Sequence, residues 1–516
     1  MRACLMGFAG AFALIALTSV HLDYQGVYYD ELHQGPASFR YLGKNPQMFT
    51  IVFNDILLLN TSYGGAIKSH VYGLYLRFIR PHFTVYSWRL LGILFVAAGL
   101  FAFYWIAGQY IHWTTGLIFA MLLLTDATVL LSTRYDWGPT ALGLSLRLLL
   151  LGTWLSMEFG RPSIRKHFFA GLFVGVAIFE KLVAVVLLGP LFLMLLSGRK
   201  LGRRVVLAAM GGGLLGVMPI LYANYGSYRH GGGFISLALV EPRHLTHLSR
   251  VTAYVYQYLA LGHGEGMGAH LLGPYSMPFW PRGEVVLMFI VLAIISVLAI
   301  QRRHSDKSMA VAGKMVAAYA LAGGLLLLVP RDTVEHHWIQ ITPFQYAAIA
   351  LAFGALSRRS PARLALITIV GALLLIRAPN VIAVERALAE GKATIGFDPV
   401  FTRLAKIAAA KSKDAAFIAQ DWGIGTQIYC MGDGDDDLVY EPFWSNDVQR
   451  VTLSMMQATK KKTLYFVSSS VDPRFADAAR SAILATTQAT DWEEAPVEKE
   501  LTDLNYFQIR KFVRRS

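Results

Sequence analysis

The stretch Gln25-Gly-Val-Tyr-Tyr-Asp-Glu-Leu-His33 follows directly on an apolar segment that runs from Leu5 to Val20. That segment is apolar enough to lie in lipid, so Asp30 and Glu31 fall within roughly one or two helical turns of a membrane surface. A charged side chain is costly there unless water solvates it or it serves a function. The stretch therefore predicts a membrane fold, and its acidic pair is the first candidate site.

Composition extends this prediction to the whole chain. The 516 residues are 55% hydrophobic and only 16% charged, which is typical of a polytopic membrane protein and not of several soluble domains. The formal net charge is +14, but Lys and Arg collect in the cytoplasmic loops of membrane proteins. We therefore expect membrane lipid and no nucleic acid among the partners. The two cysteines, Cys4 and Cys430, lie far apart and have no metal-type spacing.

Eleven apolar segments approach the length of about 20 residues that a membrane-spanning helix needs. We therefore expect an all-α polytopic membrane domain over residues 1–378. The two segments around Glu180 and Lys181 are also compatible with one broken helix, although two short spans fit the topology better. The expected spans cover residues 4–20, 86–107, 114–132, 138–157, 167–179, 182–197, 204–222, 284–300, 309–329, 339–356 and 362–378.

The charges of the loops predict the orientation. Each of the loops at residues 158–166, 197–204, 301–307 and 357–363 carries three or four cations. The positive-inside rule places these loops in the cytoplasm, which also makes the N-terminus cytoplasmic. We expect an integral protein of a bacterial inner (cytoplasmic) membrane.

The polar tail, residues 379–516, is then extracytoplasmic and is expected to be a soluble α/β domain. Its helical stretches and its strand-like runs alternate along the chain. The helical stretches cover residues 401–411 and 448–461, and the strand-like runs cover residues 416–419, 463–467 and 506–509.

Three motifs that suggest ligands fail on inspection. Asp433-Gly-Asp-Asp-Asp437 begins like a calcium loop, but Leu438 stands where that loop needs glycine and Trp444 where it needs glutamate. The segment from Gly262 to Gly268 follows no strand of a βαβ unit, so it is no dinucleotide fingerprint. The external histidines favour a hydrophilic loop over a metal site; they are His230, His244, His247, His263 and His270.

Acidic and basic residues gather at the expected outer membrane face. They are Asp30, Glu31, Lys68, Arg89, Arg134, Asp136, Glu180, Lys181, Glu335, His336 and His337. One interpretation is that they cap spans at the solvated interface, where charge is inexpensive. For Glu180, Lys181 and Arg89 this structural interpretation weighs as much as the functional one.

The order of motifs on this face resembles the GT-C superfamily of membrane glycosyltransferases over roughly residues 1–360. The resemblance is to family 39, the protein O-mannosyltransferases, and to the lipid A aminoarabinose transferases and the rhizobial lipopolysaccharide galacturonosyltransferases. No β-trefoil domain is apparent, which disfavours a protein acceptor. The motifs are Tyr29-Asp-Glu31, Tyr63-Gly-Gly-Ala-Ile-Lys68, Trp88-Arg-Leu90, Arg134-Tyr-Asp-Trp-Gly-Pro139 and Glu335-His-His-Trp-Ile-Gln-Ile-Thr-Pro343.

The resemblance implies that Asp30 is the catalytic aspartate and that Lys68 holds a lipid-linked phosphate. It also implies a hexosyl or pentosyl transferase, expected to invert the anomeric centre. Nucleotide sugars are absent outside the cytoplasm, so we expect a polyprenyl-phosphate sugar as donor and a lipid, glycan or protein as acceptor.

Physical chemistry distributes the roles among the charged residues. The leaving phosphate needs cations, for which Lys68, Arg134 and Lys181 are candidates. Asp30 is positioned to act as general base beside a low-dielectric wall. Glu31 diverges from Asp30 by about 100 degrees on a helix, so it is expected to support Asp30 and not to share its role.

The remaining candidates are assigned more broadly. Asp136 orients the acceptor, positions Arg134 or contributes to a metal site, and the sequence does not choose among these. Arg89, His336 and His337 are further substrate-binding candidates, and at most one of the two adjacent histidines is expected to point into the site. No cofactor is required, and the sequence leaves open whether the site binds a divalent metal ion.

Two other classes of protein compete with a transferase. A secondary transporter of a polar solute would carry polar residues near the membrane midplane and interrupted helices in matching halves. Here Arg147 is the main charge inside a span, and the other charges gather at one face. A non-catalytic assembly subunit is the third possibility, and it requires that Asp30 be dispensable.

Overall fold

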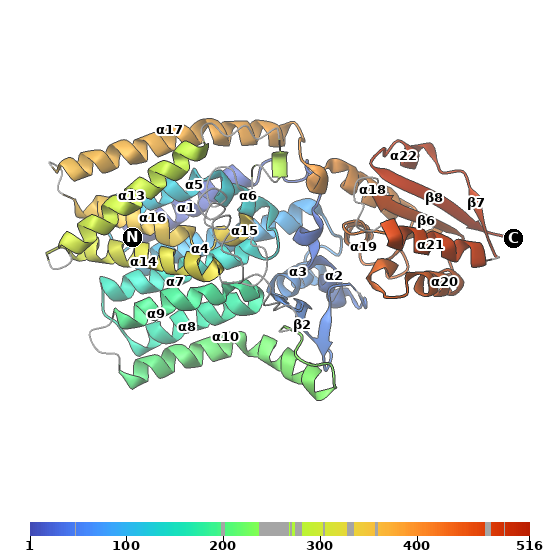
Figure 1. Ribbon diagram of the computed structural model, residues 1–516, viewed down its shortest axis with the longest axis horizontal. Helices are drawn as coiled ribbons and strands as arrows, with labels where there is room; N and C mark the ends of the chain where they lie inside the picture. The colour runs from blue at the N-terminus through green and yellow to red at the C-terminus, as the bar shows by residue number, and fades with distance from the viewer. Residues whose placement is uncertain are drawn as a thin grey trace. The chain divides into compact units, whose positions relative to one another are not determined.

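The computed structural model describes residues 1–46, 48–197, 202–236, 268, 271–273, 281–302, 305–327, 335–356, 360–469, 476–489 and 491–515 (Figure 1). The chain packs as two compact units. The first unit comprises Met1–Leu22, Ile51–Gly65 and Arg89–Glu390. The second comprises Asp23–Thr50, Ala66–Trp88 and Gly391–Ser516.

The first unit is a bundle of helices around a large apolar core, to which nearly every helix contributes. The helices lie side by side in Figure 1. They are α1 (Arg2–Thr18), α4 (Val85–Ala107), α5 (Trp113–Leu124), α6 (Ala127–Tyr135), α7 (Thr140–Glu158), α8 (Ile164–Glu180), α9 (Leu188–Leu196), α10 (Arg203–Arg229), α13 (Pro281–Arg302), α14 (Lys307–Leu327), α15 (Glu335–Trp338), α16 (Thr342–Ala355) and α17 (Pro361–Ala389).

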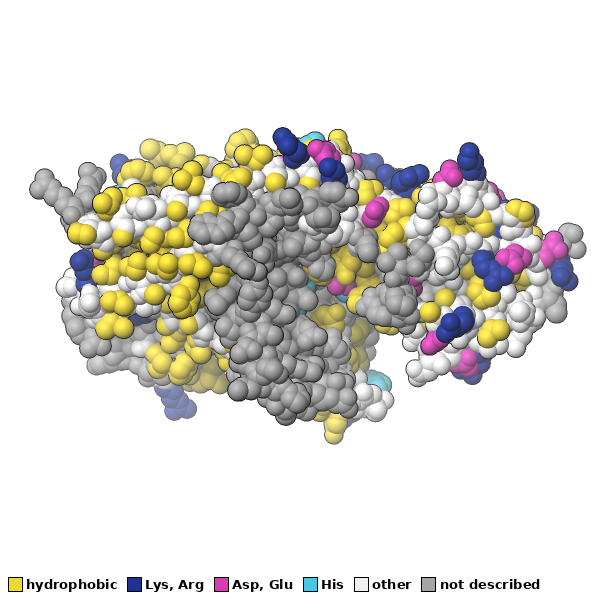
Figure 2. Space-filling model, turned by 45° about the horizontal axis from the view of Figure 1, so that its top comes forward, with side chains coloured by type: hydrophobic (Ala, Val, Ile, Leu, Met, Phe, Trp, Pro, Cys, Tyr) yellow, Lys and Arg dark blue, Asp and Glu magenta, His cyan; other side chains and the backbone are white. Residues whose placement is uncertain are grey.

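Within the described residues, six helices are long and apolar enough to cross a membrane, or seven if the pair α5 and α6 is one bent span. On the face that Figure 2 shows, hydrophobic side chains cover much of the described surface of this bundle, as expected for helices that face lipid. The prediction of an integral membrane protein is thus supported, whereas the predicted count of eleven spans is not confirmed. The six helices are α4, α7, α10, α14 and α17, with α13 from Gly283 onward.

The expected span at residues 114–132 is broken into two helices, because the chain bends by 67° between α5 and α6. Asp126 begins α6 by accepting hydrogen bonds from the backbone N–H groups of Thr128 and Val129. Arg377 of α17 donates to the Leu122 carbonyl (2.8 Å), and Tyr346 of α16 donates to the Asp126 carboxylate. A buried polar network therefore holds the bend against two neighbouring helices.

Small residues let α8 and α10 approach closely, as is common between helices in lipid. A Cβ atom built at Gly171 would lie 1.9 Å from the Ala209 carbonyl oxygen, and one at Gly212 would lie 2.0 Å from the Phe168 carbonyl oxygen. These two glycines therefore have a packing role, because no larger residue fits without moving a helix backbone.

The second unit contains the α/β tail, and the predicted helices and strands of the tail are confirmed. Its sheet has the strand order β5-β4-β6-β8-β7, with β4 parallel to β5 and β6, and β8 antiparallel to β6 and β7. The strands are β4 (Ala415–Ala419), β5 (Val439–Tyr440), β6 (Thr463–Ser469), β7 (Trp492–Ala495) and β8 (Phe507–Arg514). The helices are α18 (Pro399–Ala410), α19 (Gly425–Met431), α20 (Val448–Ala458), α21 (Ala476–Gln488) and α22 (Lys499–Thr502).

Two N-terminal segments pack with this tail in the second unit. They contain the 3₁₀ turns η1 (Tyr29–Leu32) and η2 (Phe39–Leu42) and the helices α2 (Gly35–Ser38) and α3 (Ile67–Phe78). The tail is thus not a free appendage, and α17 continues to Ala389, beyond the predicted domain boundary at residue 378. The extracytoplasmic location of the tail stays a prediction.

The acidic run at Asp433–Asp437 fastens these segments to the tail. Asp433 accepts from the backbone N–H of Phe83 (2.8 Å) and pairs with Nδ1 of His82 (2.7 Å). Asp436 accepts from the Asn45 backbone N–H (3.2 Å) and from the Tyr429 hydroxyl (2.8 Å). Protein donors therefore occupy the carboxylates that give this run its resemblance to a calcium loop.

Candidate functional site

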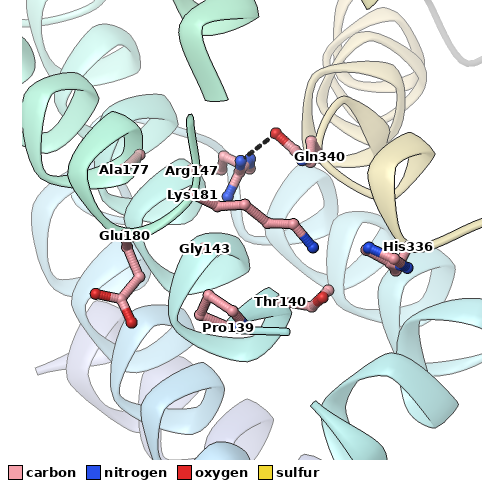
Figure 3. Close-up of a pocket in the computed structure, with 9 residues that line it drawn as sticks. All are labelled: Pro139, Thr140, Gly143, Arg147, Ala177, Glu180, Lys181, His336 and Gln340. Atoms are coloured by element: carbon pink, nitrogen blue, oxygen red, sulfur yellow. Dashed lines mark hydrogen bonds between the residues drawn. The ribbon is translucent and has the colours of Figure 1, made fainter. Parts of the chain in front are cut away.

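A small cavity lies among the helices of the first unit. Figure 3 shows the side chains around it, which come from α7, the end of α8, α15 and the turn before α16. Six of its nine lining residues are polar, and two of these carry long cationic side chains. The lining residues are Pro139, Thr140, Gly143, Arg147, Ala177, Glu180, Lys181, His336 and Gln340.

Arg147 lies inside the span α7 and is 2% exposed. Gly143, one turn earlier, makes room for it, because a Cβ atom there would lie 2.4 Å from Arg147 Nη1. Nη2 donates to the Gln340 side-chain oxygen, while Nε has no hydrogen-bond partner among the described residues. In that part of the chain no carboxylate pairs with Arg147, so its charge is buried against a neutral amide.

Lys181 enters the cavity because α8 ends at Glu180 and the backbone becomes extended at Lys181. In Figure 3 the Lys181 side chain crosses the cavity, whereas the Glu180 carboxylate points to the opposite side. The Lys181 ammonium lies 3.5 Å from the Gly138 carbonyl oxygen. The structure thus has two helices, α8 and α9, joined by a 3₁₀ turn (Leu182–Leu187), where the sequence indicated two short spans or a broken helix.

A small β-meander docks on the break after α8, and its glycines explain the Tyr63-Gly-Gly motif. It consists of β1 (Ile51–Phe53), β2 (Ile56–Thr61) and β3 (Gly64–Gly65). The backbone N–H of Leu182 donates to the Tyr63 carbonyl (3.0 Å), and Gly64 forms an antiparallel bridge with Lys181. A Cβ atom at Gly65 would lie 2.8 Å from Glu180 Oε2. The glycines therefore allow this meander to fix the backbone that presents Lys181.

The two adjacent histidines have different surroundings. His336 lines the cavity and packs on Trp137, with ring centres 4.7 Å apart. His337 is not among the lining residues, and its ring lies 4.2 Å from that of His336. Burial, together with the nearby Lys181 ammonium, holds the pKa of His337 well below its ordinary value. His337 is therefore neutral at neutral pH and adds no positive charge beside the cavity.

Arg134, a candidate for the donor phosphate, makes structural contacts. Its Nη2 donates to both carboxylate oxygens of Glu385 in α17 (2.8 Å each) and to the Leu17 carbonyl (2.5 Å). Arg89 likewise donates to the Leu22 carbonyl, and its guanidinium carbon lies 4.5 Å from the centre of the Tyr135 ring. These contacts favour a role of both arginines in holding helices together.

Asp136 ends α6 in a left-handed conformation, with φ of 41°. Its Oδ1 accepts from the backbone N–H of Ala141 (2.7 Å), in the first turn of α7, and a Cβ atom at Gly92 would lie 3.3 Å from its Oδ2. Asp136 therefore caps α7 and sets the start of the helix that carries Arg147. Its predicted catalytic role is untested by this geometry.

In the second unit, one tryptophan connects Glu31 and Lys68. The Lys68 ammonium lies 4.0 Å from the centre of the Trp88 ring, and Trp88 Nε1 donates to the Glu31 carbonyl (3.1 Å). Asp30 Oδ1 lies 3.1 Å from Nε2 of His33, and the Asp30 side chain is 21% exposed. Lys68 and Glu31 are buried, at 2% exposure each, so Asp30 is the open carboxylate of the pair.

The described residues contain no group of three or more His, Cys, Asp or Glu side chains that could hold a metal ion. Of the external histidines, His230 lies in the described part, with Nδ1 2.7 Å from the Gly226 carbonyl. Several other candidates from the sequence lie outside the described residues. They are His244, His247, His263 and His270, the glycine-rich segment at 262–267, the Glu335 side chain and parts of three basic loops.

Sequence reasoning did not single out Gln340 and Thr140 for this cavity, and it treated Arg147 only as a charge inside a span. A signal was present for Arg147, since an arginine in a membrane span is a functional candidate by default. Gln340 belongs to the Glu335–Pro343 motif, but its partner lies 193 residues earlier in the chain.

No family model matches the chain, and no curated protein sequence matches it. Solved structures do match. ArnT from Cupriavidus metallidurans in the apo state matches with a TM-score of 0.61 and 12% identity, over 98% of this chain and 97% of that one. AglB from Archaeoglobus fulgidus, in complex with an inhibitory peptide and a dolichol-phosphate, matches with a TM-score of 0.50 and 10% identity, over 90% and 69%.

Both matched proteins are members of the GT-C fold, and the first is a lipid A aminoarabinose transferase. The chain therefore has the GT-C fold, which confirms the resemblance inferred from the motifs as far as the fold is concerned.

Proposed function

We propose that this chain is a membrane glycosyltransferase that moves a sugar from a polyprenyl-phosphate donor to an extracytoplasmic acceptor. The GT-C fold supports the class of reaction. The cavity around Arg147 and Lys181 supports the donor class. The proposal keeps Asp30 as the general base, Glu31 as a supporting neighbour and Lys68 as a further phosphate-binding cation.

The observation that carries the proposal is the buried charge of Arg147. An ion in a low-dielectric interior is costly unless an opposite charge or strong hydrogen bonds compensate it. Gln340 supplies one neutral acceptor, and the Nε donor of Arg147 has no protein partner among the described residues. A phosphate offers several acceptor oxygens and negative charge, which matches the donors of a guanidinium and an ammonium.

The position of Arg147 favours a phosphate carried by a lipid. The arginine belongs to a helix with the length and composition of a membrane span, so a ligand that binds it enters apolar surroundings, which an apolar tail suits. A polyprenyl phosphate combines such a tail with the required anion. The AglB structure contains a dolichol-phosphate, a compound of the same class.

The chemistry is a single displacement at the anomeric carbon. The Asp30 carboxylate takes the proton of the acceptor hydroxyl, and the hydroxyl oxygen forms a bond to that carbon. The bond from the anomeric carbon to the phosphate oxygen breaks, and its electron pair leaves with the phosphate. Cationic side chains offset the negative charge that develops on the leaving group. Attack from the opposite side inverts the anomeric centre.

We assign structural roles to Arg134 and Arg89 within this proposal. Arg134 is already neutralised by Glu385, and Arg89 is engaged by a carbonyl group and an aromatic ring. A secondary transporter of a polar solute is the competing function. The similarity to ArnT over nearly the whole chain weighs against it.

Binding of the lipid phosphate without its sugar tests the donor site. Native mass spectrometry of the detergent-purified protein should detect bound polyprenyl phosphate, and Arg147→Gln and Gln340→Glu should each lower its occupancy. The second variant places a carboxylate against Arg147 and neutralises it without changing the size of the side chain. Arg165→Gln, at an exposed position of α8, is the matched control and should bind as the wild type does. Unchanged occupancy in both cavity variants would contradict the proposed donor site.

A further inference from the structure

Two exposed tryptophans lie at one edge of the tail sheet. Strands β4 and β5 are parallel, with Ile418 opposite Tyr440, so their carboxyl ends meet at the same edge. Trp422 follows β4 by three residues and Trp444 follows β5 by four, and their exposed fractions are 36% and 58%. The carboxyl edge of parallel strands is where α/β sheets commonly bind ligands.

Trp422 is exposed although the loop around it is firmly held. The Gln427 side-chain amide donates to the Gly423 carbonyl (2.7 Å), and the Asp421 carboxylate accepts from the backbone N–H of Ser469. Gly423 has a φ of 101°, a conformation that side chains other than glycine rarely adopt. The loop therefore presents the Trp422 indole in a fixed position.

Trp444 is fixed by a buried carboxylate. Its Nε1 donates to Glu441 Oε2 (3.0 Å), and its ring packs on Phe443, with centres 4.9 Å apart. Glu441 lies directly against Gly425, where a Cβ atom would be 2.3 Å from its Oε1. Burial raises the pKa of Glu441 to about 7. The loop that carries Trp422 and the loop that carries Trp444 therefore contact each other.

The same loop contacts the turn that carries the proposed base. The rings of Trp422 and Tyr29 meet edge to face, with centres 5.2 Å apart and an angle of 79° between their planes. Tyr29 directly precedes Asp30 in η1 and also packs edge to face on His33, whose Nε2 lies 3.1 Å from Asp30 Oδ1. All of these residues belong to the second unit.

We propose that this edge of the tail, defined by Trp422, Trp444 and Glu441, binds the acceptor and that the acceptor is a glycan. The proposal rests on the proposed function and names its acceptor class. An indole face stacks on the C–H groups of a sugar ring, and the Glu441 carboxylate holds the Trp444 indole in place for this contact. Two tryptophans provide two such faces, so an oligosaccharide fits the surface better than a single sugar.

The position of these tryptophans favours a glycan over a lipid surface. Trp422 packs against Tyr29, which directly precedes Asp30, so a ligand on this edge lies beside the turn of the proposed base. That base needs an acceptor that offers a hydroxyl group, which a saccharide supplies.

The test uses the full chain in detergent and a panel of neutral oligosaccharides of one to four sugar units, with binding measured by titration calorimetry. The affinity should rise from one sugar unit to two. Trp422→Ala and Trp444→Ala should each weaken binding by about tenfold, the range expected for the loss of one aromatic contact. Trp113→Ala, which removes a tryptophan that is 53% exposed in the first unit, should leave binding unchanged.

The outcomes separate this inference from the proposed function. Wild-type protein that binds none of the panel, or a Trp422→Ala variant that binds as the wild type does, would overturn the glycan surface. Binding of anionic lipid vesicles that depends on Trp444 would replace it with a membrane contact. Arg147→Gln should keep its affinity for the glycan while it loses its affinity for the lipid phosphate. Loss of lipid-phosphate binding with intact glycan binding would therefore report on the donor cavity alone.

Discussion

The Lys68 ammonium lies 4.0 Å from the centre of the Trp88 ring, and the same indole donates its N–H to the backbone carbonyl of Glu31. A cation held on an aromatic face keeps its charge while most of its surface is shielded from water. The contact ties Lys68 to the backbone of the turn that carries Asp30. The sequence motifs at residues 29–31, 63–68 and 88–90 thus meet at one tryptophan.

Replacement of Lys68 should affect the donor more than the fold. Lys68→Ala removes the charge and is expected to weaken binding of a polyprenyl phosphate by about tenfold, the scale of one charge-assisted hydrogen bond. Trp88→Phe is the matched variant, because it keeps an aromatic face for Lys68 and loses only the hydrogen bond to Glu31. It should bind the donor nearly as the wild type does. If Lys68→Ala binds normally but aggregates on extraction, Lys68 has a structural role instead.

Gly65 should tolerate no side chain. A Cβ atom there meets Glu180 Oε2 at 2.8 Å and the Phe179 carbonyl at 2.9 Å, so Gly65→Ala is expected to lower the unfolding free energy by about 1–3 kcal/mol. The same change should displace the backbone that presents Lys181. Gly211→Ala is the control, because nothing lies within 4 Å of the added atom in α10. Thermal unfolding of both variants in detergent measures the difference, and equal stabilities would show that the meander does not dock as described.

The location of the tail needs an engineered label, because Cys430 is fully buried and burial raises the pKa of its thiol. Cys430 should therefore resist thiol reagents on either side of the membrane. Asn446→Cys, at an exposed position of the tail, should react with an impermeant maleimide in intact cells, and Arg161→Cys only after permeabilisation. Both measurements belong in a background without Cys4. The opposite pattern would reverse the orientation and remove the argument for a lipid-linked donor.

The regular elements follow from local sequence, which is why they were predictable. Apolar runs long enough to span a membrane predicted most of the long helices. Short runs rich in aromatic and β-branched residues predicted β4, β6 and β8 of the tail. The bend between α5 and α6 was not predictable in this way. It depends on Asp126, which caps α6, and on Arg377 and Tyr346, which lie more than 200 residues away.

The sequence predicted which types of residue line the cavity, but not which side chains pair with one another. Lys181 and His336 were expected in a polar site, and both line the cavity. Arg134 was expected at the phosphate, but its partner is Glu385, 251 residues later, and nothing local in the sequence indicates that pair. Arg147 is the converse case, because the sequence does not show that its partner is the neutral side chain of Gln340, and this pairing is what supports its proposed role in binding the donor.

The central claim is that Asp30 is the base of a lipid-linked glycosyl transfer, and single-turnover transfer from a polyprenyl-phosphate sugar tests it most directly. General-base catalysis contributes about 10² to 10⁴ in rate, so Asp30→Asn should lose at least about 10²-fold in that rate while it still binds polyprenyl phosphate and stays monodisperse. Glu31→Gln should lose less, because Glu31 is buried, at 2% exposure, whereas the Asp30 side chain is 21% exposed. Full transfer by Asp30→Asn, with a collapse in Asp136→Asn, would contradict the account and move the base to the turn after α6.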